Sequence, residues 1–526
     1  MSAAGASPGR SRAVVVMAST MVGVVATFGL SAAVGNLLGA AGAGEFFQVT
    51  ALFTIVSSIS VLGAETTMVR MTSRSLALDN ELELRALAYV GVVPPVAVAL
   101  LAGGALWVWP EAVQPLVTVP GEDGARLVRA VGLALPFAVL LAVCSGGVRG
   151  LGKPVAATSL QSLAVPGLRL AAVVGALVVT ASTSDAFLAW LSPLPVLGLI
   201  ALALLVRAVS RRTRSVESGA LAGAASVRSV APEFWRFSLP RGVSIAVERS
   251  LDWVDVLLVI QIAGPAAGGI YAIVSRLAVA GTVLDTAARV TWGPQVSAAL
   301  ARGESDRARR LFDMVTMILI GLGWPAYATL AVFAPTVLAL FGPEFPAGAT
   351  ALRVMCGAMM ILQAAGMLQT FLLMGGRSHW QMSNRLVQLV LLCGGCLILV
   401  PRMGFLGAAV AWSVAIIVDA VLASIQVRRI APIGSSWRRA VKIGLPAVAL
   451  FGGGGAVLVA VLGQNLLALA VAVVVLGVPY VVFVILLARR RGLLDRRGSG
   501  QHSRPTDADV VDAPDPRSAP EVVRRP

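Results

Sequence analysis

The sequence predicts an all-α polytopic membrane protein: about 14 transmembrane helices, with two six-helix bundles related by an internal repeat plus two C-terminal helices. Composition is the first observation, because 57% of the residues are hydrophobic, 13% are charged and the mean hydropathy is +0.85. The second is that apolar runs of roughly 20 residues, the length needed to cross a bilayer, recur along nearly the whole chain. The third is a degenerate repeat that relates the two halves of the sequence.

The apolar runs define the domain organisation. They cover approximately residues 13–35, 44–66, 86–109, 127–148, 155–179, 184–207, 239–262, 268–291, 311–333, 348–374, 380–400, 404–427, 440–463 and 466–488. We therefore expect an N-terminal segment 1–12, a first six-helix bundle 13–207, a linker 208–235, a second bundle 236–428, helices 13 and 14 within 429–489, and a disordered tail 490–526. The linker is rich in Ser and Gly and the tail in Pro, Asp and Arg, compositions typical of segments without a packed core.

Positive charges set the orientation, because Lys and Arg collect in the loops that stay cytoplasmic. With the N-terminus inside, the inner loops and both tails hold 33 of the 42 Lys and Arg residues, and the outer loops hold three. We therefore expect a multi-pass protein of the cytoplasmic membrane with both termini in the cytoplasm. Topology then explains most of the net charge of +16, and we expect no nucleic-acid partner.

One predicted span, Leu239 to Ile262, carries ionic residues where a lipid-facing helix would carry none. Glu248, Asp252 and Asp255 recur at i, i+4 and i+7, the spacing of one helical face. An ionisable side chain in the bilayer core costs at least ~2.5–3.5 kcal/mol, so this face must look into protein or a water-filled cavity. The sequence therefore predicts a polar space within the membrane.

The internal repeat is visible when the second half is shifted back by 225 residues. Gly264 then falls on Gly39, and Gly269 falls on Gly44. An even number of spans separates the copies, so both enter the membrane in the same orientation. We expect them to be related by an axis along the membrane normal, with the substrate space at their interface.

Further charges within the predicted spans leave two interpretations open. Counted from the outer turn, Arg276 lies about as deep as Asp255, and Asp285 lies within about one turn of Arg249. Such pairs either neutralise one another and join two helices, or line a cavity where arginines meet an anionic substrate and a carboxylate takes up H⁺ or Na⁺. Arg169 follows a Pro-Gly pair near mid-membrane and either faces the cavity or extends to an interface.

The remaining reactive side chains predict no enzyme. His379 falls in an inner turn and His502 in the tail, so neither is placed for a zinc site or a catalytic triad. The Cys393-x-x-Cys396 pair lies in an apolar run without other ligands nearby, which indicates buried apolar residues rather than a metal site. Asp419 is interpreted as a lone acid, and Arg385 as interfacial. No metal or organic cofactor is expected.

Five segments together resemble a known family. They are the turn Leu38-Gly-Ala-Ala-Gly-Ala-Gly-Glu-Phe-Phe47, Phe237-Ser-Leu-Pro240, Asp255-Val-Leu-Leu-Val-Ile260, Gly269-Ile-Tyr271 and Gly404-Phe-Leu-Gly-Ala-Ala409. In order and spacing, over residues 10–430, they resemble the oligosaccharide (O-antigen type) flippases of polysaccharide biosynthesis. That family belongs to the MATE-like MOP flippase superfamily, which also holds lipid II flippases and multidrug and toxin extrusion (MATE) antiporters.

The resemblance implies two six-helix bundles that rock between inward- and outward-open states around a cationic cavity. The expected substrate is a polyprenyl-diphosphate-linked glycan, moved across the lipid bilayer, with a polysaccharide polymerase or glycosyltransferases as further partners. By position, Arg276 is the closest match to the family's cavity arginines, with Arg169 and Arg249 as weaker candidates. The candidates for H⁺ or Na⁺ coupling are Asp255, Asp252, Glu248 and Asp285.

Three alternatives remain open at this point. A lipid II flippase would share the architecture and the class of substrate. A cation-coupled multidrug exporter of the MATE type would use the acidic stripe as its drug and proton site, and a scaffold for polysaccharide assembly would need no polar interior. The sign of the cavity separates the first two, because a net-positive cavity favours a diphosphate and a net-negative one favours cationic drugs.

Cysteine accessibility tests the predicted orientation. In a background without the four native cysteines, a Cys at position 115, in the outer loop after the third span, should react with a membrane-impermeant maleimide added to intact cells. A Cys at position 220, in the linker, should react only after permeabilisation. The reverse labelling pattern would overturn the orientation.

Overall fold

The computed structural model describes residues 8–78, 80, 83–119, 121–217, 227–366, 368–374, 378–430 and 437–483, and every regular element within these ranges is a helix. Residues 1–7, residues 218–226 of the predicted linker and the whole predicted tail 490–526 lie outside the described residues. The chain divides into two compact units, Met1–Ala472 and Val473–Pro526. The prediction of an all-α polytopic membrane protein is confirmed.

The elements follow the order of the predicted spans. The first half contains α1 (Pro8–Ser60), α2 (Ala64–Ala77), α3 (Glu83–Val108), η1 (Pro110–Ala112), η2 (Gln114–Leu116), α4 (Gly121–Gly150), α5 (Pro154–Thr158), η3 (Ser159–Ala164), α6 (Val165–Thr180), α7 (Thr183–Leu191) and α8 (Pro193–Glu217).

The second half continues with α9 (Val227–Leu251), α10 (Val254–Ala263), α11 (Pro265–Val279), α12 (Thr282–Ala301), α13 (Ser305–Val332), α14 (Ala334–Ala339), η4 (Phe345–Gly348), α15 (Ala349–Ala365), α16 (Leu368–Met374), α17 (Ser378–Met403) and α18 (Phe405–Ile430). Beyond the repeat lie α19 (Trp437–Val448), η5 (Ala449–Gly453), α20 (Gly454–Leu462) and α21 (Leu466–Ala472). The second unit begins with η6 (Val473–Gly477).

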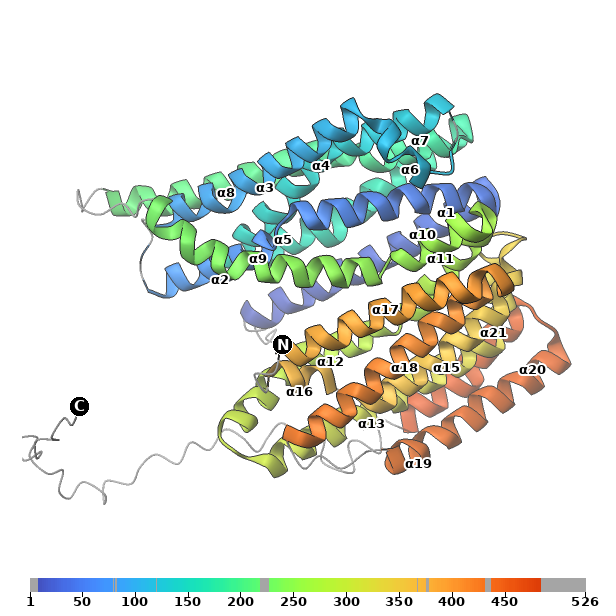
Figure 1. Cartoon of the computed structure of the whole chain (residues 1–526). Coiled ribbons are helices and arrows are strands. Elements are labelled where there is room, and N and C mark those ends of the chain that lie inside the picture. Colours follow the sequence, from blue (N-terminus) through green and yellow to red (C-terminus); the bar gives the residue numbers. More distant parts are fainter. Residues whose placement is uncertain are drawn as a thin grey trace, which may run out of the picture. The chain divides into compact units, whose positions relative to one another are not determined.

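Twelve helices in the described chain are long and apolar enough to cross a membrane. One of them, Val15–Ser60, has 46 residues and changes direction at Gly39, so it contains both of the first two predicted spans (Figure 1). The predicted span 239–262 does not appear as a membrane-length apolar helix, because it is divided between α9 and the short α10. These two differences account for the gap between the predicted fourteen spans and the observed twelve.

The prediction of one continuous helix over 239–262 was wrong. α9 ends at Leu251, Trp253 leaves the helical region with φ −139° and ψ −20°, and α10 begins at Val254. The break keeps the backbone satisfied, because the Asp252 and Trp253 amides donate to the Glu248 and Ser250 carbonyls. Apolar periodicity gives no sign of such a break, and the acidic stripe is therefore not one helical face.

The two halves turn at equivalent residues. Gly39 (φ 68°) and Gly264 (φ 88°), 225 positions apart, both adopt the left-handed backbone that favours glycine. Ala181 (φ 49°) and Gly404 (φ 59°), 223 positions apart, also share that region at matching helix ends. The repeat read from the sequence is therefore present in the backbone.

α1 and α11 lie side by side and touch at a symmetric pair of glycines (Figure 1). A Cβ on Gly44 would lie 1.9 Å from the Pro265 carbonyl oxygen, and a Cβ on Gly269 would lie 2.0 Å from the Ala40 carbonyl oxygen. Ala40 and Pro265 are also equivalent at the offset of 225. Small residues thus allow backbone contact between the two halves, as is common where membrane helices pack.

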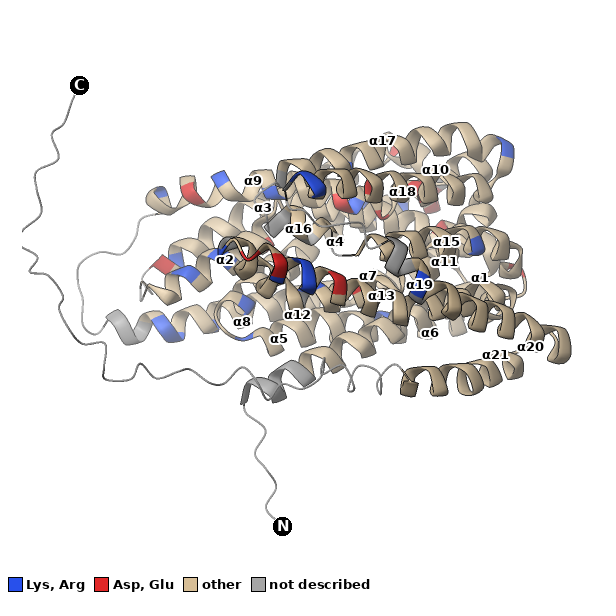
Figure 2. Cartoon of the chain, turned by 90° about the horizontal axis from the view of Figure 1, so that it is seen from below, with Lys and Arg blue, Asp and Glu red and all other residues tan. Residues whose placement is uncertain are grey.

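The helices beyond the repeat pack against α13 and α14. A Cβ on Gly444 of α19 would lie 2.2 Å from the Trp324 ring, so α19 sits directly on that ring. In the turn after α20, Gln464 donates to the Val332 carbonyl at 3.1 Å and accepts from the Thr336 hydroxyl at 2.8 Å. Among the described residues, charges gather toward the ends where α2, α8 and α9 meet, while the α20–α21 end has few (Figure 2).

Alanine substitution tests the close approach of α1 and α11. Gly44→Ala or Gly269→Ala should lower the melting temperature of the purified protein, because the new methyl group must displace a backbone carbonyl, at ~1–3 kcal/mol. Gly104→Ala in α3 is the matched control, since its Cβ meets nothing within 4 Å. The control should be neutral or stabilised by ~0.5–1 kcal/mol. Equal melting temperatures for all three variants would contradict the close contact.

Candidate substrate cavity

A cavity of about 620 Å³ lies among α9–α12 and α15–α18. This volume is typical of sites for small ligands. Its lining includes five carboxylates, three arginines and three glutamines: Glu248, Asp252, Asp255, Asp285 and Asp419, then Arg276, Arg289 and Arg385, then Gln369, Gln381 and Gln388. All lining residues fall between 248 and 419, so this cavity is built by the second half of the repeat and not, as the sequence suggested for the substrate space, by both halves.

Asp255 lies on the cavity wall, is 98% buried, and accepts a hydrogen bond at each carboxylate oxygen. The Tyr271 hydroxyl donates to its Oδ2 at 2.7 Å, and the Val256 amide donates to its Oδ1 at 2.8 Å. Its place in the first turn of α10 adds a favourable interaction with the helix dipole. Asp255 therefore joins α10 to α11 through Tyr271, a partner that charge patterns in the sequence do not reveal.

Arg276 is held by aromatic rings. Its guanidinium lies 3.8 Å from the centroid of Phe47 and 4.9 Å from that of Trp253, and its Nη1 donates to the Ser31 hydroxyl at 3.4 Å. Ser31 and Phe47 flank the turn of α1 at Gly39, so Arg276 reaches from α11 to both arms of α1. No ion pair in the described chain joins it to Asp255, and the bond to Ser31 is the one hydrogen bond found there for its five N–H donors.

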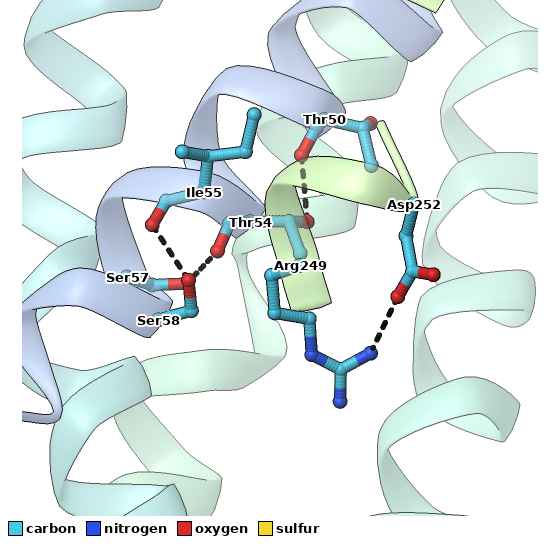
Figure 3. Close-up of polar contacts among 7 residues, drawn as sticks. All are labelled: Thr50, Thr54, Ile55, Ser57, Ser58, Arg249 and Asp252. Atoms are coloured by element: carbon cyan, nitrogen blue, oxygen red, sulfur yellow. Dashed lines mark hydrogen bonds and ion pairs between the residues drawn. The ribbon is translucent and has the colours of Figure 1, made fainter. Parts of the chain in front are cut away.

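Asp252 pairs with Arg249, at 3.3 Å, and both side chains are exposed. The pair that the sequence allowed between Arg249 and Asp285 is not among those found in the described chain. Figure 3 shows the Arg249–Asp252 pair beside a part of α1 that carries four hydroxyl groups. The hydroxyl groups belong to Thr50, Thr54, Ser57 and Ser58, and each donates to a backbone carbonyl one turn earlier in α1.

Sequence reasoning missed a second polar group in the cavity. Asp419 is 96% buried and accepts from Gln369 Nε2 at 3.0 and 2.9 Å, while Arg385 Nη1 lies 3.8 Å from its Oδ2. Asp419, interpreted as the lone acid of its helix, thus has partners on two other helices, and Arg385, interpreted as interfacial, lines the cavity beside it. Gln381, Asn384, Arg385 and Gln388 recur at helical spacing on α17, and this polar stripe was the available signal.

Two candidate residues have different surroundings from those expected. Arg169 does not line this cavity: its guanidinium lies 3.6 Å from the Trp190 ring centroid, and its Nε donates to the Trp190 carbonyl at 3.2 Å. Pro166 and Gly167 lie in the first turn of α6, directly after the π-helical turn η3. Asp285 lines the cavity with Arg289 one turn away, and its Oδ2 is buried without a hydrogen-bond partner in the described chain.

The cavity is polar without a strong positive charge. Five carboxylates and three arginines line it, a formal balance of −2, and Arg249 beside Asp252 brings the balance to −1. The cationic cavity implied by the family resemblance is not what these lining residues provide. The described residues contain no group of three or more His, Cys, Asp or Glu side chains placed to hold a metal ion.

No family model and no curated protein matches this chain. Solved structures do match it. The lipid II flippase MurJ in an inward closed conformation has a TM-score of 0.66 at 11% identity, covering 91% of this chain and 99% of that one. A multidrug resistance MATE family transporter of the MOP superfamily, in an inward-facing conformation, has a TM-score of 0.58 at 16% identity. That match covers 81% of this chain and 99% of that one. This chain shares the fold of these two transporters.

A third match shows how polarity varies on the MOP fold. It is a MOP superfamily transporter from Pyrococcus furiosus, with a TM-score of 0.54 at 18% identity, covering 81% of this chain and 95% of that one. That transporter has a binding pocket of reverse polarity, which suggests a different function for it. Pocket charge, rather than the fold, is therefore the feature to compare when function is argued.

Two substitutions separate the roles of Tyr271 and Arg276. Tyr271→Phe removes a donor from a buried carboxylate and should destabilise the protein by ~1–3 kcal/mol, seen as a lower melting temperature. Arg276→Ala leaves Asp255 with both its donors and should fold at normal levels. A loss of folding in Arg276→Ala that is restored by adding Asp255→Ala would show instead that the two residues are structural partners.

Proposed function

We propose that this protein moves a polyprenyl-diphosphate-linked oligosaccharide from the inner to the outer leaflet of the cytoplasmic membrane by alternating access, for cell-surface polysaccharide biosynthesis. The observation that carries the proposal is the state of Arg276 in a cavity enclosed by membrane helices. Its guanidinium lies against the rings of Phe47 and Trp253, Asp255 is bonded to Tyr271 instead, and the one hydrogen bond of Arg276 in the described chain goes to the Ser31 hydroxyl. A planar guanidinium in this state suits a phosphate group, which accepts paired hydrogen bonds.

The extent of the structural match supports a flippase. The lipid II flippase covers 91% of the chain, whereas the MATE family transporter covers 81%. A lipid-linked substrate would come from glycosyltransferases and pass to a polymerase, which we propose as partners. The substrate's sugar distinguishes this proposal from a lipid II flippase, which the same geometry would also serve.

Coupling to H⁺ or Na⁺ is proposed at the carboxylates of the cavity wall. Glu248, Asp252, Asp255 and Asp285 all line it. Asp255 is the most constrained of them, because Tyr271 and the Val256 amide hold both oxygens. Arg169 and Arg249 remain weaker proposals for substrate contact, since Arg169 stacks on Trp190 and Arg249 pairs with Asp252.

A cation-coupled multidrug exporter is the second candidate. The observation in its favour is the formal charge of the cavity, −2 for the lining residues, because a net-negative cavity attracts cationic drugs. The two candidates differ in what they move. Efflux of a cationic dye such as ethidium by cells that overproduce the protein, lost in Asp252→Asn, would favour the exporter.

Depletion of the protein in its own host tests the flippase. Lipid-linked oligosaccharide should accumulate, as measured by mass spectrometry of extracted lipids, and the wild-type gene should reverse this. Arg276→Ala, expressed at normal levels, should not reverse the accumulation. Arg276→Lys should reverse it only weakly, because Lys keeps the charge but loses the planar fork of donors. Full complementation by Arg276→Ala would remove Arg276 as the substrate ligand, and no accumulation at all would reject the flippase.

Gradient dependence tests the coupling. Asp252→Asn and Asp285→Asn should each be folded, and the one at the coupling site should transport without dependence on the H⁺ or Na⁺ gradient. The measurement is transport in proteoliposomes with and without each gradient. If both variants keep the wild-type gradient dependence, neither Asp252 nor Asp285 is the coupling site.

A further inference from the structure

The part of the cavity formed by α12, α16, α17 and α18 differs chemically from the part around Arg276. α16 packs against α12, α17 and α18, and this junction brings Asp285, Gln369, Arg385 and Asp419 to one cavity. Three polar atoms there are buried without a hydrogen-bond partner in the described chain: Asp285 Oδ2, Gln369 Oε1 and Arg385 Nε. We call Asp285, Gln369 and Arg385 the amide cluster.

Charge in this region is already compensated. Asp419 is held by Gln369 and lies 3.8 Å from Arg385, and Asp285 has Arg289 on the next turn of α12. A dianionic ligand group would add negative charge beside the two carboxylates, Asp285 and Asp419. An organic cation would add positive charge beside the two arginines, Arg289 and Arg385. The region therefore favours a neutral group over either ion.

The open atoms specify a ligand that both donates and accepts hydrogen bonds. Gln369 Oε1 accepts hydrogen bonds, and so does Asp285 Oδ2 when its carboxyl group is ionised, whereas Arg385 Nε only donates. A phosphate diester only accepts and an ammonium group only donates, so each would leave part of the cluster unsatisfied. A hydroxyl group does both and can therefore satisfy each of the three atoms.

Aromatic surface completes the chemistry. Trp253 and Trp412 also line the cavity. An aromatic ring has flat apolar faces, and a sugar ring presents C–H groups on one face and hydroxyl groups at its edge. Amides, carboxylates and a guanidinium beside aromatic faces thus suit a group that is polar at its edge and apolar on its face.

We propose that the amide cluster binds hydroxyl groups of the saccharide part of the substrate, while Arg276 binds the diphosphate. This assignment rests on the proposed flippase function and divides its site into two subsites. Arg276 contacts Trp253, which lines the same cavity, so one lipid-linked glycan reaches both subsites. The lipid chain stays outside the polar cavity.

Binding of two lipids that differ only in the sugar tests the division. The full-length protein in nanodiscs is titrated with polyprenyl diphosphate and with the lipid-linked glycan extracted from the depletion strain, and binding is followed by tryptophan fluorescence. Gln369→Leu should weaken binding of the glycan-bearing lipid about tenfold, the loss expected for one hydrogen-bonded group. It should leave polyprenyl diphosphate unchanged, whereas Arg276→Ala should weaken both.

Control variants protect the test from changes in folding. Gln295→Leu is the matched control, because Gln295 is exposed on α12, donates only to its own helix at 3.4 Å and does not line the cavity. Asp285→Leu is the second variant: it removes the acceptor Oδ2, which has no partner in the described chain, and leaves the bonds between Gln369 and Asp419 intact. It should also discriminate against the glycan-bearing lipid. Melting temperatures identify any variant that fails to fold.

Each outcome decides a different statement. The sugar subsite would be overturned if Gln369→Leu and Asp285→Leu both bound the glycan-bearing lipid as tightly as wild type. It would also be overturned if these variants bound both lipids equally more weakly than wild type. Either result leaves the flippase proposal standing, because wild-type binding of the lipids is unaffected. Wild-type protein that binds neither lipid but binds ethidium would reject the flippase proposal itself.

Discussion

Burial of charge away from water is the constraint on which this structure depends. An unpaired ion within the bilayer costs several kcal/mol, so each buried polar group needs its own partner. Asp255 is satisfied by Tyr271 and a backbone amide, and Asp419 by Gln369 with Arg385 nearby. Arg276 instead is covered by aromatic faces, which compensate its charge without using its N–H donors.

The same constraint explains why a symmetric backbone carries an asymmetric interior. Gly39 and Gly264 turn the two halves alike, and Gly44 and Gly269 make equivalent contacts. At the offset of 225, however, Asp255 corresponds to the buried Leu30 and Arg276 to the buried Ala51. The first half therefore fills with apolar side chains the space that the second half fills with charge. We propose the substrate contacts on the second half of the repeat, while both halves supply helices that pack where the halves meet, α1 from the first and α11 from the second.

The candidate site shows where pattern reasoning works and where it stops. Five of the seven residues chosen from the sequence line the cavity, because an ionic residue in an apolar run must face a polar space. Their partners are not predictable in this way, since the stripe assumes one straight helix, whereas the helix breaks at Trp253, between Asp252 and Asp255. Arg385 falls near the end of a predicted span and Asp419 is the lone acid of its helix, so neither pattern predicts that the two side chains meet.

The sequence by itself determined the class, most spans, the repeat and the presence of a polar interior, because these follow from hydrophobic length, charge placement and glycine position. It also predicts an orientation, which rests on the same local rules. Only the tertiary structure decided which residues meet. Arg276 meets Phe47, and Gln369 meets Asp419, through helix rotation and crossing. Those quantities depend on contacts between segments far apart in the chain, and no local pattern of residues records them.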